Sequence, residues 1–169
     1  MQEITANEAF DKFRPYSFVF VIAKDKNQTS GMVCAWQARC SYDPPMFVIS
    51  LSKRGHTHKL IRNSKEFTIA VPNKDLIKEV EFFGSTHGDK VDKFKETQIK
   101  TEPAKEIGAP LLTDATINFE CKLVKEVDLK NNILCIGQVV AAHVNEDKKV
   151  LLCVDKKDGK RVFNEFYLV

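Results

Sequence analysis

Residues 50–61 combine the side chains that a phosphate-binding segment needs. Hydroxyls and a guanidinium stand where an expected strand gives way to an expected helix. Amide groups at a helix N-terminus lack carbonyl partners, so they bind anions, and an arginine adds a paired charge. Ser50, Ser52, Arg54 and Thr57 are therefore candidate anion ligands. The alternative is that Thr57 only caps the helix and that Arg54 is solvated.

Residues 29–45 suit a flat aromatic ligand. Small side chains such as Gly31 and Ala35 let a planar ring lie close to backbone amides, and Trp36 offers a broad apolar wall. A rigid Asp43-Pro44-Pro45 corner follows, because each proline fixes its own φ. The alternative is that Trp36, the only tryptophan, anchors the core.

Two further candidates stand outside these segments. Lys93 lies in a polar, glycine-flanked stretch, where a cation could reach a phosphate; the alternative is a solvated lysine. His143 ends an alternating strand face at an expected barrel rim, so it meets a ligand there or bonds to a carbonyl. The other members of that face are Cys135, Gly137, Val139 and Ala141.

Other chemistries lack their motifs. No G-x-G-x-x-G, P-loop, H-E-x-x-H or nucleophile elbow is present. His56 and His58 flank Thr57, but no third metal ligand is near them in the sequence, so we expect no metal site. The five cysteines show no C-x-x-C spacing, and most lie in apolar runs, which favours buried, reduced thiols.

The elements that position these residues are mostly short strands. Alternating and apolar runs, separated by polar turns, predict a single mainly β domain over residues 1–169, with short helices, in a small barrel. Thr5 and Glu8 predict a capping box for the first helix. The expected helices are 3–13, 57–64 and 74–83; the expected strands are 17–23, 31–38, 46–52, 66–71, 117–123, 133–144, 150–154 and 161–168; residues 84–110 are expected to be irregular.

Composition excludes several function classes. The chain is 43% hydrophobic and 29% charged, as soluble globular domains are. Its net charge of +3 comes from dispersed lysines, so we expect no nucleic-acid partner. No apolar run approaches the ~18 residues of a membrane span, and residues 1–13 do not form a signal peptide. We therefore expect a cytoplasmic protein with no membrane partner.

Over residues 16–144 the chain resembles the flavin reductase-like family of FMN-binding split-barrel proteins, which includes flavoredoxins and archaeal ferric reductases. Each marker is weak alone, whereas their order and spacing together are specific. The resemblance implies a mainly β split β-barrel with a Greek-key-like strand order. The markers are Gly31-Met32, Ala35-Trp36, Ser41, Asp43-Pro44-Pro45, Arg54, Thr57, Leu60-Ile61, Glu66-Phe67, Gly88-Asp89, Val91-Asp92-Lys93-Phe94, Ala109-Pro110-Leu111, Glu120-Cys121, Gly137 and Val139.

The resemblance also implies FMN at a homodimer interface. Ser50, Ser52 and Arg54 would then lie near the phosphate, while the backbone of Met32, Val33, Cys34 and Ala35 would line the ring. Further contacts would come from Ser30, Trp36, Thr57, Lys93, His143 and Phe166, or Phe163 in place of Phe166. Many relatives have Asn at position 30 and Thr-Ala-Ser at 33–35, so this chain lacks polar groups that would tune the flavin.

Three functions remain open. In the first, NAD(P)H reduces the FMN, which passes electrons to free flavin, ferric chelates or a redox protein, with no catalytic side chain required. In the second, a flavoredoxin-like carrier exchanges electrons only with proteins. In the third, the barrel binds another ligand without redox chemistry, because residues 33–35 have lost polar groups.

Overall fold

A seven-stranded antiparallel sheet forms the body of the structure, for which a computed structural model describes residues 1–167. The strand order is β3-β2-β6-β9-β10-β5-β4, and every neighbouring pair is antiparallel. The strands are β2 (Val19–Asp25), β3 (Gln28–Cys34), β4 (Gln37–Tyr42), β5 (Pro45–Ser52), β6 (Glu66–Val71), β9 (Ile117–Asp128) and β10 (Asn132–Val144).

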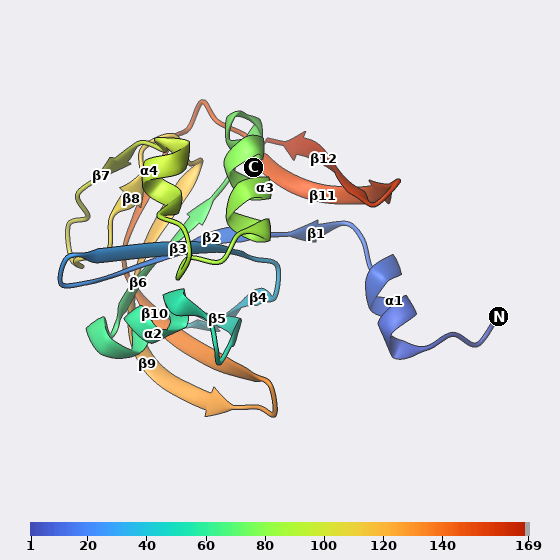
Figure 1. Ribbon diagram of the computed structural model, residues 1–169, viewed down its shortest axis with the longest axis horizontal. Helices are drawn as coiled ribbons and strands as arrows, with labels where there is room; N and C mark the ends of the chain where they lie inside the picture. Colours follow the sequence, from blue (N-terminus) through green and yellow to red (C-terminus); the bar gives the residue numbers. More distant parts are fainter. Residues whose placement is uncertain (168–169) are drawn as a thin grey trace.

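This sheet curls into an open barrel (Figure 1). Strand β3 is at one edge and β5 is next to the other edge, yet the two contact each other. The Cys34 thiol of β3 also donates to the Ser50 carbonyl of β5 at 3.7 Å across this gap. Among the strands of this sheet, β5, β6, β9 and β10 are consecutive along the chain. In space the first of them, β5, lies beside the last, β10, which is a Greek-key arrangement. The predicted mainly β, split-barrel fold is confirmed.

Strand β2 is apolar on both faces because it separates two hydrophobic clusters. Val21 and Ala23 face the barrel interior, where they pack with Ile69 and other buried residues. Phe20 and Ile22 face outward and pack in a second cluster. Successive side chains of a strand point to opposite faces. A strand between two hydrophobic clusters therefore needs an apolar residue at every position, and residues 19–23 are all buried.

The helices cover these two clusters. Helix α2 (His56–Ser64) buries Leu60 and Ile61 in the interior cluster. The 3-10 turn η1 (Lys74–Leu76) leads into α3 (Ile77–Ser85), whose Val80 and Phe83 pack on the outer face of β2. The short helix α4 (Lys93–Thr97) contacts both α3 and β3.

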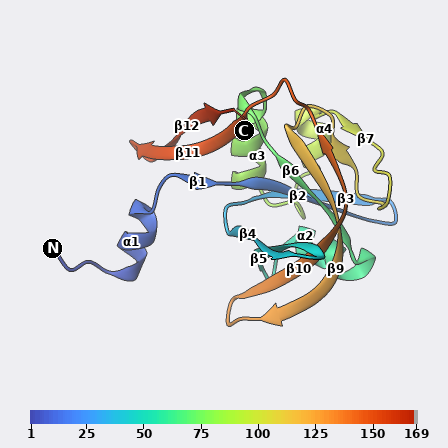
Figure 2. The same cartoon turned by 180° about the vertical axis from the view of Figure 1, so that it is seen from behind.

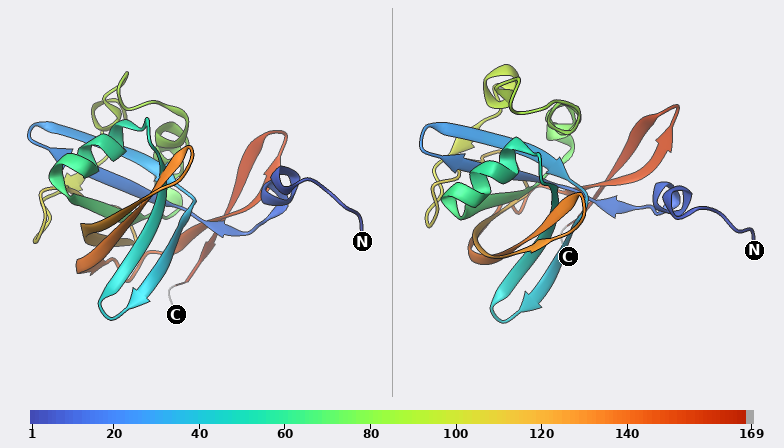
Figure 3. Two further views of the ribbon diagram at one scale, coloured as in Figure 1. Left: turned by 90° about the horizontal axis from the view of Figure 1, so that it is seen from below. Right: turned by 60° about the horizontal axis from the view of Figure 1, so that its bottom comes forward.

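The remaining elements lie at the periphery. A small sheet joins β1 (Tyr16–Ser17), β11 (Val150–Lys157) and β12 (Lys160–Phe166), and a second pairs β7 (Thr101–Glu102) with β8 (Leu111–Leu112). Helix α1 (Ala6–Lys12) has the predicted Thr5–Glu8 capping box, but it buries no residue and stands away from the body (Figures 1 and 2). The β4–β5 hairpin also extends from the barrel (Figure 3).

Three expectations about the elements need correction. The expected 31–38 strand is wrong in its second half, because β3 ends at Cys34 and the chain bends before β4 begins. Residues 84–110, expected to be irregular, contain α4 and β7, whose partner β8 follows directly after them. The last strand ends at Phe166, and position 168 lies outside the described residues. Within residues 1–167, no helix combines the length and apolar character needed to cross a membrane.

Candidate functional site

Two adjoining hollows open where β3, α2 and α3 meet. The first has a volume of about 250 Å³ and lies at the bend between β3 and β4. It is lined by Tyr16, Phe18, Met32, Val33, Cys34, Ala35, Trp36, Ser50, Ser52, Val80, Gly84, Asn132, Arg161 and Phe163. We call it the ring hollow, because it contains the five consecutive residues 32–36 identified above as a support for a flat ligand.

The second hollow, of about 320 Å³, lies at the N-terminus of α2, and we call it the anion hollow. It shares Met32, Val33, Ser52 and Gly84 with the ring hollow, so the two form one continuous site. Its other lining residues are Arg54, Gly55, His56, Thr57, Phe83, Ser85, Thr86, His87, Gly88 and Lys93. The two segments that sequence analysis singled out therefore face one shared space.

A buried hydrogen bond joins these two segments. The hydroxyl oxygens of Ser30 and Thr57 are 3.0 Å apart, and each residue is 3% exposed. The N-cap of α2 is Gly55, not Thr57, and no side chain caps this helix. The alternative that Thr57 serves as a cap is therefore wrong. The first amides of α2 have no carbonyl partner within the helix, so they can bind an anion in the hollow beside them.

Lys93 is buried against the anion hollow. Asp92 caps α4 by accepting a bond from the Lys95 amide, which fixes the position of the neighbouring lysine. The Lys93 ammonium donates to the carbonyls of Gly31 at 3.1 Å and Phe83 at 2.8 Å. An ammonium has three N–H groups, so one is left for a ligand. Burial lowers the pKa of Lys93. The alternative of a solvated lysine is wrong.

Close packing explains two glycines of the site. A Cβ on Gly31 would lie 2.8 Å from the Phe83 ring, and one on Gly88 would lie 2.7 Å from the Ser30 hydroxyl. Any larger residue would displace α3 or the 84–88 loop from β3. Gly31 therefore serves helix packing.

The rim of the site is open. Trp36 is 68% exposed, so the alternative that it anchors the core is wrong. Arg54 is also exposed, with its amide bonded to the Ser52 hydroxyl at 3.3 Å. Burial raises the pKa of the Cys34 thiol, which donates to the carbonyls of Trp36 and Ser50 and so holds the β3–β4 bend.

His143 and Phe166 lie outside both hollows. Phe166 is 43% exposed, whereas Phe163, the alternative named above, lines the ring hollow. The expected face shared by Cys135 and His143 is wrong, because Val140 is an extra residue between the register pairs of β10 with β9. Beyond this bulge the side chains of β10 point to the opposite face from the one that the alternation predicts. His143 therefore bonds to the buried Glu120 at 2.6 Å.

Sequence reasoning missed several lining residues that are distant in the chain. Arg161 comes from β12, and Asn132, which donates to the Ser50 hydroxyl at 3.0 Å, comes from β10. His87 follows α3 in the stretch from 84 onward. The only sequence signal for His87 was the length of that polar stretch, because long excursions in small domains are usually functional; no sequence signal marked Arg161 or Asn132.

The cysteines remain free thiols in the part of the chain that the structure describes. Four are buried, as expected, whereas Cys40 is exposed on β4. Burial, followed by the charge of Glu120, raises the pKa of Cys121 to about 12, so this thiol is protonated and unreactive at neutral pH.

Comparisons with known proteins agree with this architecture. The family model described as "Flavin reductase like domain" matches residues 13–160. A ferric-chelate reductase (NAD(P)H) from Archaeoglobus fulgidus is 29% identical, with 90% of this chain and 91% of that protein covered. The resemblance seen in the sequence is confirmed.

Solved structures share the fold. A flavoredoxin from Methanosarcina acetivorans matches with a TM-score of 0.84 at 20% identity, over 100% of this chain and 92% of that one. An FMN-binding protein from Thermus thermophilus matches with a TM-score of 0.84 at 23% identity, over 99% and 97% of the two chains.

Proposed function

Since this chain belongs to the flavin reductase-like domain family, we propose that it binds FMN across the two hollows and transfers electrons through it. The observation that carries this proposal is the Ser30–Thr57 hydrogen bond of 3.0 Å. It holds the ring-binding and phosphate-binding segments side by side, next to the anion hollow that Thr57 lines; Ser30 itself lies outside both hollows.

The residues of the anion hollow fit a phosphate. Because no side chain caps α2, its first amides are available as donors. Lys93 offers its remaining N–H group from within the hollow, and Arg54 offers a guanidinium at the rim. Ser52 lies between the two hollows, so its hydroxyl is placed to contact the chain that links phosphate to ring.

The residues of the ring hollow fit a flat, largely apolar ligand. Met32 to Ala35 line this hollow, where we infer that their backbone faces the ring, and the exposed Trp36 follows them. Phe163 and Arg161 approach from β12. These residues bind and orient the ring; none of them has to take or give a proton in the reaction.

When bound, FMN would supply the redox chemistry, with NAD(P)H as the donor and free flavin, a ferric chelate or a redox protein as the acceptor. The name of the Archaeoglobus fulgidus relative, a ferric-chelate reductase (NAD(P)H), supports this donor and this acceptor class. A solvent-facing rim also suits exchange with diffusing partners, because a fully enclosed ring could not be reached by a second substrate.

A homodimer is part of the proposal. Phe10 on helix α1 and Phe13 just after it are 74% and 76% exposed, and the helix buries no residue in its own chain. Trp36 and Tyr42 are likewise exposed, at 68% and 96%. A second copy would cover such aromatic side chains, and it would account for a cofactor role of His143, which lies outside the hollows of its own chain.

An absorbance spectrum of the purified protein, recorded anaerobically before and after addition of NADH or NADPH, tests the proposal. We expect the visible absorption of oxidised flavin and its loss on reduction. Flavin-loaded protein that neither nucleotide reduces, but a reduced redox protein does, would replace the reductase with a flavoredoxin-like carrier. Protein that stays colourless after addition of FMN would leave only a non-redox binding role.

Light scattering tests the proposed dimer, because the measured mass should be twice the chain mass of 19.2 kDa.

A further inference from the structure

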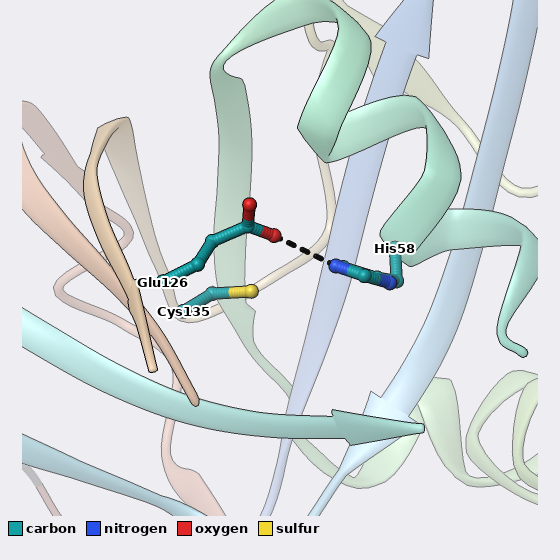
Figure 4. A group of neighbouring side chains, drawn as sticks. All are labelled: His58, Glu126 and Cys135. Atoms are coloured by element: carbon teal, nitrogen blue, oxygen red, sulfur yellow. Dashed lines mark hydrogen bonds and ion pairs between the residues drawn. The ribbon is translucent and has the colours of Figure 1, made fainter. Parts of the chain in front are cut away.

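Three metal-ligand side chains converge beneath α2 (Figure 4). His58 from α2, Glu126 from β9 and Cys135 from β10 each offer one donor atom, and these atoms all lie within 4.8 Å of one another. His58 is 3% exposed and Cys135 is fully buried. Nothing in the proposed flavin chemistry uses this group.

We propose that His58, Glu126 and Cys135 form a binding site for a divalent cation of the zinc type. Imidazole nitrogen, carboxylate oxygen and thiolate sulfur are the three donors that zinc takes in proteins, and calcium or magnesium would not choose a set with sulfur. Three protein ligands leave a fourth tetrahedral position for water.

Metal binding moves the donor atoms in two directions: the hydrogen-bonded pair opens, while the donors that lie furthest apart, up to 4.8 Å, draw together. His58 Nε2 and Glu126 Oε1 are hydrogen-bonded at 2.8 Å. Metal–ligand bonds of about 2.0–2.1 Å in a tetrahedron would hold these atoms roughly 3.3 Å apart, and a zinc–sulfur bond of about 2.3 Å would hold the sulfur roughly 3.5 Å from the nitrogen. The pair therefore opens by about half an ångström, within the freedom of a glutamate side chain that is 20% exposed.

The proton balance is simple. Burial, followed by the charge of Glu126, raises the pKa of Cys135 to about 12, so the metal-free thiol is protonated at neutral pH. When a cation binds, the S–H bond breaks, a sulfur–metal bond forms, and one proton leaves to solvent. In the metal-free protein the Nε2–H of His58 donates to the Glu126 carboxylate, so on metal binding the proton of the neutral imidazole moves from Nε2 to Nδ1 and Nε2 bonds to the metal.

The surroundings support the site. The Arg62 Nε lies 3.5 Å from Glu126 Oε2, so it holds the oxygen that the metal does not need. A hollow of about 540 Å³, lined by His58 and Arg62 among others, opens beside the site. The expectation of no metal site considered only sequence neighbours of the histidines, whereas the other two ligands come from strands β9 and β10.

The chain contains its own negative control. His143 and Glu120 form a second histidine–carboxylate pair, and Cys121 is adjacent to Glu120 in the sequence, with a pKa also near 12. Neighbouring residues of a strand point to opposite faces, so this sulfur faces away from the pair. Among residues 1–167, only the His58 group brings three such donors together.

Cobalt binding tests the site without reference to flavin activity. Full-length protein, freed of metal with a chelator, is titrated with Co²⁺ and followed at wavelengths longer than those flavin absorbs. We expect one equivalent of Co²⁺ to give a tetrahedral thiolate spectrum that one equivalent of Zn²⁺ removes. Cys135→Ala should abolish the thiolate signal, whereas Cys121→Ala, a matched change of an equally buried thiol, should leave it intact.

Glu126→Gln covers the case in which Cys135→Ala does not fold. The amide oxygen of Gln can still accept the His58 hydrogen bond, so the fold is retained, but the anionic ligand is lost. We expect at least a ~10-fold weaker affinity for Co²⁺, with an unchanged circular dichroism spectrum. A wild-type protein that gives no cobalt–thiolate signal, or a Glu126→Gln protein that binds as tightly as wild type, would overturn the proposal.

Discussion

The hydroxyl groups of Ser30 and Thr57 meet at 3.0 Å in a place that excludes water, and this bond ties β3 to the first turn of α2. Thr57→Val keeps the shape of the side chain but leaves the Ser30 hydroxyl without this partner. An unpaired buried hydroxyl costs about 1–3 kcal/mol. We therefore expect urea denaturation to show a loss of this size in the free energy of unfolding.

The double variant Ser30→Ala with Thr57→Val provides the matched comparison. Removing both hydroxyls leaves no orphaned group, so it should be less destabilised than the sum of the two single variants. Thr113→Val, at an exposed position, should change stability little. Additive single effects would show that the two hydroxyls do not stabilise each other.

Lys93→Met probes the proposed phosphate contact. The methionine retains the apolar part of the side chain but loses the ammonium, one charge-assisted donor worth about 1.5–3 kcal/mol. The affinity for FMN, measured by fluorescence quenching of the flavin, should fall about 10- to 100-fold.

Lys95→Met serves as its control, because Lys95 is on the same helix and is exposed. That variant should bind FMN like the wild type. Since Lys93 also donates to the carbonyls of Gly31 and Phe83, its loss should lower stability as well. Equal FMN affinity of both variants and the wild type would remove Lys93 from the proposed site.

Local patterns in the sequence predicted much of this fold. Thr5 and Glu8 are three residues apart, and their capping box formed as expected because it depends on a single helical turn. The 30–36 and 50–57 segments could be paired in advance through the family resemblance, which carries long-range information. Without the resemblance, the residue types indicated only that one segment could bind a phosphate and that the other could support a flat ring.

Long-range features could not be read from local patterns. The bulge at Val140 inverts the facing of His143, yet no residue type in that stretch marks it. Arg161 reaches the ring hollow because β12 folds back beside β11, a tertiary event with no local signature. For the same reason His58 showed no metal partners, since Glu126 and Cys135 come from strands far along the chain.

Gly137 on β10 leaves room for the ring of Phe67 inside the barrel. A Cβ at this position would lie 2.3 Å from Cζ of Phe67, which is fully buried and cannot move away. Gly137→Ala should therefore cost about 1–3 kcal/mol in unfolding free energy through overpacking, measured by urea denaturation.

The second change Phe67→Leu shortens the opposing ring and should recover part of the loss caused by Gly137→Ala. Gly108→Ala is the control, since its nearest neighbour would be a side-chain oxygen of Glu66 at 3.5 Å, an ordinary contact. If Gly137→Ala and Gly108→Ala both left the free energy of unfolding unchanged, Phe67 would not fill the space beside Gly137.

The buried Glu120 should make stability depend on pH. Burial alone would raise the pKa of its carboxyl, but bonds from the amides of Lys105 and Glu106 and from His143 lower the pKa below its usual value of 4.5. A carboxyl whose pKa is lower in the folded state stabilises the fold above the unfolded pKa. That contribution is lost as the pH falls through the folded value.

Glu120→Gln tests this dependence. At neutral pH the variant should lose roughly 2–4 kcal/mol of unfolding free energy, because an amide can satisfy fewer of these donors than a carboxylate. The gap to wild type should shrink below pH 4.5, where the protonated glutamate comes to resemble glutamine. Urea denaturation across this range gives both values, with Glu146→Gln, an exposed position, as the control. A gap that stays constant with pH would mean that Glu120 is not held as a carboxylate by its three donors.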